Sequence, residues 1–473
     1  MNKTSSSIIT LFVFICLNYS VSAQNITISG QDSSYAGSVL KFYTRADLIT
    51  NLEKKLGELT VGDDGSFHLE LNINQETLIY TYTGIYKCYL FAEPNKDYHI
   101  ILPEFREKKP EDIVNPYFSE TELYIAFEGA DKYDLQNNII ALEQTYEQLI
   151  VSDYVVKRGN TKKLDSIIST IDSAFADYDS KYFNIYKKYR WNALKNLAVK
   201  RNVYYAGKNH FLDKPIYYNN ICYMDCFNTI FSNFFSFYSQ TEEGKDIYDD
   251  IELSKSVSAL KKTISKSIWL NNDTLMELII LKGLHDAFYP DHNGTQIIFK
   301  KEHLFQTLDS IKLNSKIEMH RIIAKNIDKK VRHLMKGSPA PNFSLKDIKG
   351  NLYTLEDFRG KYVYLSFFHI HSYQCRQELE LLKNLKQKHN KLYEMVTILY
   401  TEDFEKTYEY LKENKCKWLF LSHENDPDVL KKYDIKAYPT YFFIDKEGKL
   451  ALSPAQSPTQ DIETQILRIL KED

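Results

Sequence analysis

Residues 361–371 read KYVYLSFFHIH, and residues 372–376 continue as SYQCR. The first stretch is an almost unbroken apolar and aromatic run, which predicts a buried strand over Tyr362–Phe368. Apolar residues then recur at helical spacing over Arg376–Lys388, which predicts an amphipathic helix. The sequence therefore predicts a buried strand that runs into a helix, with Ser372 and Cys375 where the helix opens.

Strand and helix patterns alternate from Gly337 to the end of the chain. The further elements that the pattern predicts are a strand over 395–400, a helix over 404–414, strands over 418–421 and 441–445, and a closing helix over 459–470. This order is typical of a βαβ unit followed by a hairpin and a helix, with helices on both faces of a small sheet. We expect residues 336–473 to form one α/β domain.

Three ordered motifs accompany this pattern. Residues 337–350 read GSPAPNFSLKDIKG, residues 355–361 fit L-x-x-F-x-G-K, and residues 435–440 read IKAYPT. In this order they resemble the thioredoxin-like, TlpA/ResA and AhpC/TSA superfamily of exported bacterial proteins. The resemblance implies a thiol-disulfide oxidoreductase of the cell envelope that acts on protein thiols or disulfides. We expect no cofactor.

The chain departs from this family at the attacking cysteine. In active members a Trp precedes the first Cys of a Cys-x-x-Cys pair, and the helix N-terminus lowers the pKa of that thiol. Here His371 and Ser372 take these two places. The resemblance makes Cys375 the second cysteine, which has no local partner to release a mixed disulfide. We therefore expect a degenerate site without ordinary dithiol reductase activity.

The resemblance also assigns a substrate-binding segment. Residues 438–440, Tyr438, Pro439 and Thr440, match the segment that carries the family's cis-proline. An extended polypeptide can pair with the backbone beside such a proline. One reading is therefore that catalysis is lost and that the cleft between Cys375 and Pro439 remains as a binding site for an extended polypeptide.

A second reading keeps redox chemistry in altered form. Ser372-x-x-Cys375 can be laid over the Thr-x-x-Cys element of peroxiredoxins, in which the hydroxyl supports a reactive thiolate. Arg376 adds positive charge beside it. The proline that opens the peroxiredoxin motif is Phe368 here. This reading predicts a monothiol site at Cys375.

A third reading is a metal site. His369 and His371 alternate onto one face at the strand end, and Cys375 lies one turn into the helix. Imidazole and thiolate ligands of this kind suit copper or zinc. The alternative is that both histidines are polar residues at the exit of a strand, with His371 in place of the Trp. These three residues are weak candidates only, and we expect no metal.

The other cysteines do not predict a disulfide scaffold. Five of the six remain after residue 23, an odd and sparse count for an exported chain. Cys416 is expected at the edge of the sheet opposite Ser372. Cys222 and Cys226, one helical turn apart, and Cys88 on a strand are expected to be buried, small hydrophobic residues.

The preceding residues fall into two composition regimes. Residues 24–110 alternate with period two, which predicts an antiparallel β-sandwich-like domain, with a hairpin signal at Asp63-Asp64-Gly65. Residues 111–335 change to helical spacing, as at Leu135, Ile139, Leu142 and Tyr146. We expect a multidomain chain: a β domain, an all-α region, and the thioredoxin-like domain.

Residues 1–23 have the pattern of a secretory signal peptide. Lys3 precedes an apolar run over Ile8–Leu17, and Val21-Ser22-Ala23 offers a cleavage site before Gln24. We expect a periplasmic or otherwise exported protein with no integral membrane segment after cleavage. The formal charge of −3 shows no basic field of the kind that nucleic-acid binding requires, so we expect no nucleic-acid partner.

Overall fold

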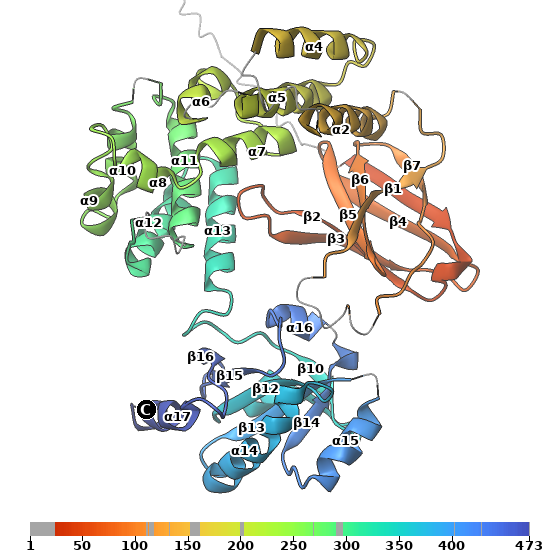
Figure 1. Cartoon of the computed structure of the whole chain (residues 1–473), viewed down its shortest axis with the longest axis vertical. Coiled ribbons are helices and arrows are strands. Elements are labelled where there is room, and N and C mark those ends of the chain that lie inside the picture. Colours follow the sequence, from red (N-terminus) through yellow and green to blue (C-terminus); the bar gives the residue numbers. More distant parts are fainter. Residues whose placement is uncertain are drawn as a thin grey trace, which may run out of the picture. The chain divides into compact units, whose positions relative to one another are not determined.

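The computed structural model describes residues 24–109, 112, 118–131, 133–151, 161–198, 203–267, 269–289, 297–401, 403–426 and 428–472. The predicted signal peptide lies outside the described residues. The chain divides into two compact units. The first is formed from the described parts of residues 1–45, 53–105 and 122–199, and the second from those of residues 46–52, 106–121 and 200–473. Figure 1 shows their elements.

The first unit contains two β-sheets that share one core. Its strands are β1 (Gln24–Gln31), β2 (Val39–Arg45), β3 (Glu53–Thr60), β4 (Ser66–Ile73), β5 (Thr77–Thr83), β6 (Tyr86–Ala92), β7 (Asp97–Ile101), β8 (Thr121–Tyr124) and β9 (Ala126–Phe127). The sheets have the orders β4-β1-β7-β9 and β3-β2-β5-β6-β8. Side chains from both sheets, among them Ile28, Phe42 and Leu71, form a single hydrophobic core. This confirms the β domain, but β1 and β7 run parallel.

The predicted hairpin at Asp63-Asp64-Gly65 is wrong. The turn itself forms, since Gly62 N donates to Ser66 O at 2.8 Å and Gly65 has a φ of +81°. However, β3 and β4 on either side of it belong to different sheets. Strand β4 pairs instead with β1 over its full length, which places its apolar residues in the core between the sheets. The turn therefore carries the chain from one sheet to the other.

Helices follow in both units. The first unit has α2 (Leu135–Val151), α4 (Thr161–Ser173) and α5 (Lys181–Ala198). The second unit has α6 (Val203–Phe211), α7 (Ile221–Ile230), α8 (Phe234–Tyr238), α9 (Ile247–Glu252), α10 (Val257–Ile264), α11 (Asp273–Ala287), α12 (Lys301–Asn314) and α13 (Glu318–Arg332). Helix α11 is buried on every side from Leu275 to Leu284. Such all-round burial makes it the central helix of this region. A central helical region is confirmed, but residues 121–127, inside the predicted all-α range of 111–335, form β8 and β9 and belong to the two β-sheets.

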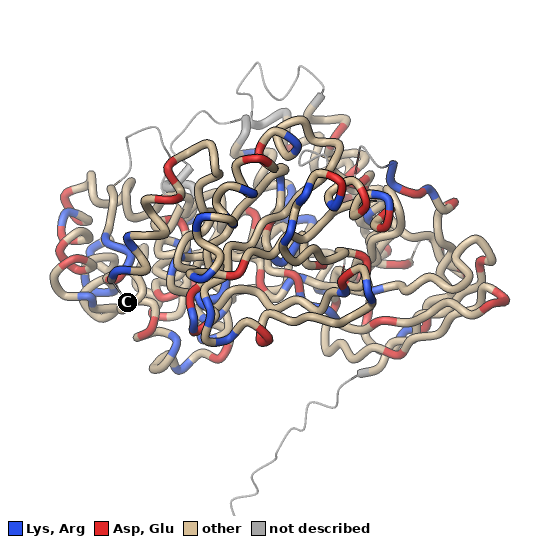
Figure 2. Tube along the Cα trace, turned by 90° about the horizontal axis from the view of Figure 1, so that it is seen from below, with Lys and Arg blue, Asp and Glu red and all other residues tan. Residues whose placement is uncertain are grey.

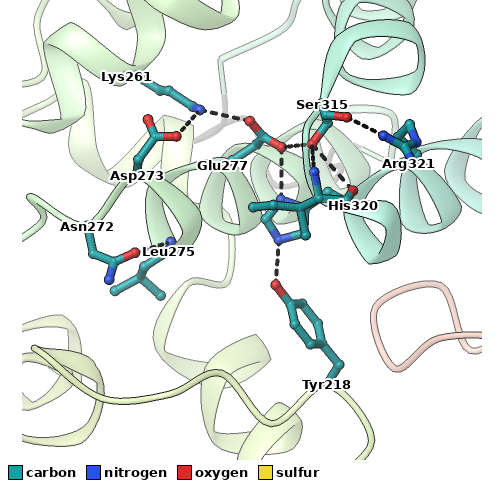
Figure 3. A network of polar contacts seen from close by, with 10 residues as sticks. Tyr218, Lys261, Asn272, Asp273, Leu275, Glu277, Ser315, His320 and Arg321 are labelled. Carbon is teal, nitrogen blue, oxygen red and sulfur yellow. Dashed lines mark hydrogen bonds and ion pairs between the residues drawn. The ribbon is translucent and has the colours of Figure 1, made fainter. Parts of the chain in front are cut away.

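One carboxylate on α11 ties four other segments together (Figure 3). Glu277 accepts a hydrogen bond from Lys261 Nζ at 2.7 Å, contacts His320 Nδ1 at 2.9 Å, and accepts a further bond from the Ser315 hydroxyl. The far side of the His320 ring contacts the Tyr218 hydroxyl at 2.8 Å. Burial alone would raise the pKa of Glu277, but these hydrogen bonds outweigh it and lower the pKa to about 2.

The last part of the second unit is an α/β domain. Its elements are β10 (Ser344–Lys346), β11 (Leu352–Thr354), β12 (Val363–His369), α14 (Tyr373–His389), β13 (Glu394–Tyr400), α15 (Phe404–Glu413), β14 (Leu419–Ser422), α16 (Asp428–Lys432), β15 (Thr440–Ile444), β16 (Leu450–Ala455) and α17 (Ile462–Glu472), with 3-10 turns at Leu355–Phe358 (η2) and His423–Asn425 (η3). The seven strands have the order β11-β10-β14-β13-β12-β15-β16.

Strand β12 separates two hydrophobic cores in this domain. Tyr364 and Phe368 point into one core, which α14 and α17 cover, whereas Leu365 and Phe367 point into the other, which α16 and η2 cover. This alternation confirms the predicted buried strand and the helices on both faces. No helix among the described residues is long and apolar enough to cross a membrane.

Replacing Glu277 with Gln removes the charge that holds Lys261 and His320, and we expect this to cost about 2–4 kcal/mol of local stability. The folded-state pKa of about 2 lies below the ordinary 4.5, so the stabilisation is complete above pH 4.5 and is lost as the pH falls towards 2. Hydrogen exchange in peptides from α11 and α13 measures both effects.

The matched control is Glu318→Gln, because Glu318 pairs with Arg321 on the same region but is 62% exposed. That change should alter local stability by less than about 1 kcal/mol. Equal losses in the two variants, or a Glu277→Gln loss that is unchanged at pH 3, would contradict the role given to Glu277.

Candidate functional site

The site lies at one edge of the C-terminal sheet, where three parallel strands end. Strand β12 pairs with β13 and β13 with β14, all in the same direction, so their C-terminal ends meet at one edge. The chain passes directly from His369, the last residue of β12, through a short turn to α14. Open α/β sheets bind ligands at this edge, which makes it the candidate site.

Ser372 joins α14 to the segment before β15. As the N-cap of α14, its hydroxyl accepts a hydrogen bond from Cys375 N at 3.4 Å, and it donates to Tyr438 O at 3.1 Å. The Tyr438–Pro439 peptide bond is cis. Thr440, the first residue of β15, donates from its hydroxyl to Ala437 O at 2.6 Å. The structure therefore brings the predicted Ser372, Cys375 and Tyr438–Thr440 positions together.

The Cys375 thiol is enclosed by the protein. Its residue is 0% exposed and belongs to the core beneath α14. Burial raises the pKa of the Cys375 thiol to about 11, and the opposing hydrogen bonds with the His369 backbone and Ser372 do not offset it. A thiol in this environment is almost entirely protonated at neutral pH.

Arg376 contributes little to activating this thiol. Its guanidinium Nη1 donates to Ile370 O at 3.1 Å and to His371 O at 3.3 Å, and the side chain is exposed. Its charge lowers the pKa of Cys375 less than any other cause acting on that group. The peroxiredoxin-like reading relies on the charge of Arg376, but this side chain is directed at the loop carbonyls and not at the thiol.

A buried carboxylate one turn beyond Cys375 was not predicted from the sequence. Glu378 is 0% exposed and accepts hydrogen bonds from Gln374 Nε2 at 2.9 Å and from the Tyr441 hydroxyl at 2.5 Å. Its charge also contributes to the raised pKa of Cys375. The signal was present, since a Glu beside Leu379 lies on the apolar face of the predicted helix, where an acidic residue is unusual.

Four rings from the ends of successive strands form a cluster beside Ser372. The Tyr400 ring lies 5.4 Å from His369, 5.9 Å from Tyr438 and 4.5 Å from His423, measured between centroids. The planes of Tyr400 and Tyr438 differ by 25°, so the two rings stack. We call Tyr400, His369, Tyr438 and His423 the ring cluster. Only His369 and Tyr438 in this cluster were singled out from the sequence.

The described residues contain no metal-binding group. The rings of His369 and His371 lie 5.4 Å apart, as the alternation predicted, but no three His, Cys, Asp or Glu side chains in the described part of the chain could hold a metal ion. The weak candidate set of His369, His371 and Cys375 therefore does not form a ligand set. His369 instead packs its ring against Tyr400.

The other cysteines among the described residues are buried and form no disulfide. Cys416 precedes β14 and lies at the edge of the sheet opposite Ser372, as predicted, because β14 runs parallel to β13 and β12. Burial raises the pKa of Cys416 to about 11 and that of Cys226 to about 12. Cys416 therefore lies at the far edge of the sheet from Cys375.

Comparison with known proteins supports the placement of this domain. Residues 336–453 match the family model "AhpC/TSA family". The chain is similar to the thiol-disulfide oxidoreductase ResA of Bacillus subtilis, with 29% identity over 29% of this chain and 77% of that protein. It is also similar to the thioredoxin-like protein YneN of the same organism, with 28% identity over 25% of this chain and 71% of that protein.

Solved structures are similar to a comparable share of this chain. The thioredoxin domain of a thiol-disulfide oxidoreductase from Bacteroides vulgatus is 27% identical over 29% of this chain and 98% of that chain, with a TM-score of 0.27. An exposed lipoprotein thioredoxin of Streptococcus pneumoniae is 28% identical over 28% of this chain and 100% of that chain, with a TM-score of 0.24. The C-terminal domain of this chain is a TlpA/ResA-like member of the AhpC/TSA family, with the thioredoxin fold.

Proposed function

We propose that this chain is an exported protein whose thioredoxin-fold domain binds an extended polypeptide beside Ser372 and Pro439 and does not carry out dithiol–disulfide exchange. One observation carries the proposal: the single cysteine of the site is fully buried, and Ser372 stands between it and the segment around Pro439. The family resemblance identifies the position of the site. The chemistry of the side chains there favours polypeptide binding over thiol exchange.

Dithiol exchange needs two thiols in succession. A thiolate first attacks a disulfide sulfur, and a second thiol then releases the mixed disulfide. Residue 372 is a serine, whose hydroxyl does not ionise near neutral pH. With a pKa of about 11, only about one Cys375 thiol in ten thousand is ionised at pH 7. Both the attacking group and the reactive state of the remaining thiol are therefore missing.

Support for polypeptide binding comes from the segment before β15. The backbone at Tyr438 and Pro439 is held in place by the Ser372 hydroxyl and by the stacked Tyr400 ring. A backbone fixed in this way loses little conformational entropy when an extended chain pairs with it. The relatives named as thiol-disulfide oxidoreductases point to protein partners for this domain.

Support for export comes from residues 1–23, whose pattern fits a cleaved secretory signal. Along the part of the chain that the structure describes, basic and acidic residues are interspersed (Figure 2), and those residues form no basic field for nucleic acid. A polypeptide is thus the partner class that fits best.

We predict that Cys375 in the folded protein reacts very slowly with iodoacetamide at neutral pH. Because burial raises its pKa to about 11, the alkylation rate should still be rising above pH 9. Mass spectrometry of the Cys375 peptide across a pH series measures this, with Cys375→Ala as the blank. A rate that levels off below about pH 8, as for an activated thiolate, would support the monothiol reading instead.

We predict that the wild-type protein does not accelerate insulin reduction by dithiothreitol, whereas Ser372→Cys does. The substitution places a thiol at the N-terminus of α14, three residues before Cys375, which restores both steps of exchange. Ser372→Ala is the matched control and should stay at background in the same turbidity assay. Wild-type activity equal to that of Ser372→Cys would refute the proposed loss of exchange.

We predict that the wild-type protein binds reduced, carboxymethylated α-lactalbumin, an unfolded polypeptide with blocked thiols. Tyr438→Ala should weaken this binding at least about fivefold, since truncating a central aromatic contact costs about 1 kcal/mol or more. Tyr410→Ala, at an exposed tyrosine of α15, should leave it unchanged. Fluorescence anisotropy gives the three dissociation constants. Absence of binding by the wild-type protein would sink the proposal.

A further inference from the structure

His423 contacts the proposed binding segment through a single intervening ring. It begins η3 directly after β14, and its ring lies 4.5 Å from that of Tyr400. Tyr400 in turn stacks on Tyr438 at 5.9 Å. Tyr438 precedes Pro439, and its carbonyl accepts the hydrogen bond from Ser372. A displacement of His423 therefore changes the support of the residue on which polypeptide binding is proposed to depend.

The environment of the His423 ring favours its neutral form. Its Nδ1 is buried and has no hydrogen-bond partner. The imidazolium ion carries a proton on both ring nitrogens, so protonation would place a buried N–H at Nδ1 without an acceptor. An unsatisfied buried donor of this kind is costly. Burial accordingly lowers the pKa of His423 below its ordinary 6.5, against smaller opposing effects of the Leu399 backbone and Glu424.

The neighbouring charges do not supply the missing acceptor. Glu424 lies in the same turn and is exposed. Asp426, just after the turn, is paired with Lys432 at 2.6 Å. Lys346 of β10 is a cation whose backbone pairs with Ser422, the residue before His423. The other titratable rings of the cluster are Tyr400, which packs directly against His423, and His369 and Tyr438, both of which contact Tyr400.

We propose that His423, acting through Tyr400, is a positioning residue for the Tyr438–Pro439 segment and makes polypeptide binding there weaken as the pH falls. The inference rests on the proposed function, because it names the regulation of the same site. At neutral pH the neutral ring packs against Tyr400 and holds Tyr438. Protonation favours a ring position in which Nδ1 reaches water, and that movement removes the support of Tyr400.

The sign follows from proton linkage. The ring binds its proton less readily in the packed state than in a state exposed to water, so the packed state is favoured above the ordinary pKa of 6.5 and is progressively lost below it. If polypeptide binding lowers the pKa of His423 by one further unit, affinity should fall several-fold, and at most about tenfold, between about pH 7.5 and pH 5.

The test compares the ratio of the dissociation constants of carboxymethylated α-lactalbumin at the two pH values. We expect a ratio well above one for the wild-type protein and a ratio near one for His423→Phe, which keeps a ring against Tyr400 but cannot titrate. His423→Ala should weaken binding at both pH values, with His423→Phe recovering part of the loss. His68→Phe, at an exposed histidine of β4, should keep the wild-type ratio.

Three outcomes distinguish the role of His423 from the polypeptide binding on which it rests. Binding with a ratio that His423→Phe leaves intact, or that His371→Phe abolishes instead, overturns the role of His423 while polypeptide binding stands. Absence of binding at every pH overturns the proposed function. In that case NMR spectra of the free protein test whether His423 is coupled to Tyr438. The ring signals of Tyr438 should shift with pH at the same midpoint as those of His423. Different midpoints refute the coupling.

Discussion

The parallel pairing of β12 with β13, and of β13 with β14, is the constraint on which the whole site depends. It brings the ends of three strands to one edge, so that His369, Tyr400 and His423 meet although each comes from a different strand connection. Antiparallel β15 then starts at that same edge with the segment at Pro439. A register shift of one residue in any of these strand pairs would move its side chains to the other face of the sheet, and the ring cluster would not form.

The pKa values of two buried groups move in opposite directions, although burial alone would raise both. Glu277 is surrounded by three hydrogen-bond donors that favour its charge, and its pKa falls to about 2. Cys375 is buried to a similar degree, yet its hydrogen bonds are few and a carboxylate, Glu378, lies one turn away, so its pKa rises to about 11. Burial holds a thiol or carboxyl neutral unless hydrogen-bond partners that favour the charged form outweigh it.

The sequence was sufficient to predict those parts of the structure that depend on local residue patterns. The strand at Tyr362–Phe368, the start of a helix at Ser372 and the alternation of its neighbours depend on residues close in the chain, and they were predicted correctly. The ring cluster could not be foreseen, because it depends on which strands pair. The same limit explains the hairpin error: Gly65 defines a turn, but only the competition of β1 for β4 decides to which sheet the following strand belongs.

The Ser372 bridge has a consequence for the environment in which the domain works. A cysteine pair at this position has two chemical states, and the hydrogen bonding around the helix start changes whenever the pair is oxidised or reduced. The hydroxyl of Ser372 has one state, and its bonds to Cys375 N and Tyr438 O involve no sulfur. The link between α14 and the Pro439 segment is therefore indifferent to surrounding oxidants and reductants, and this part of the domain surface stays the same in both conditions.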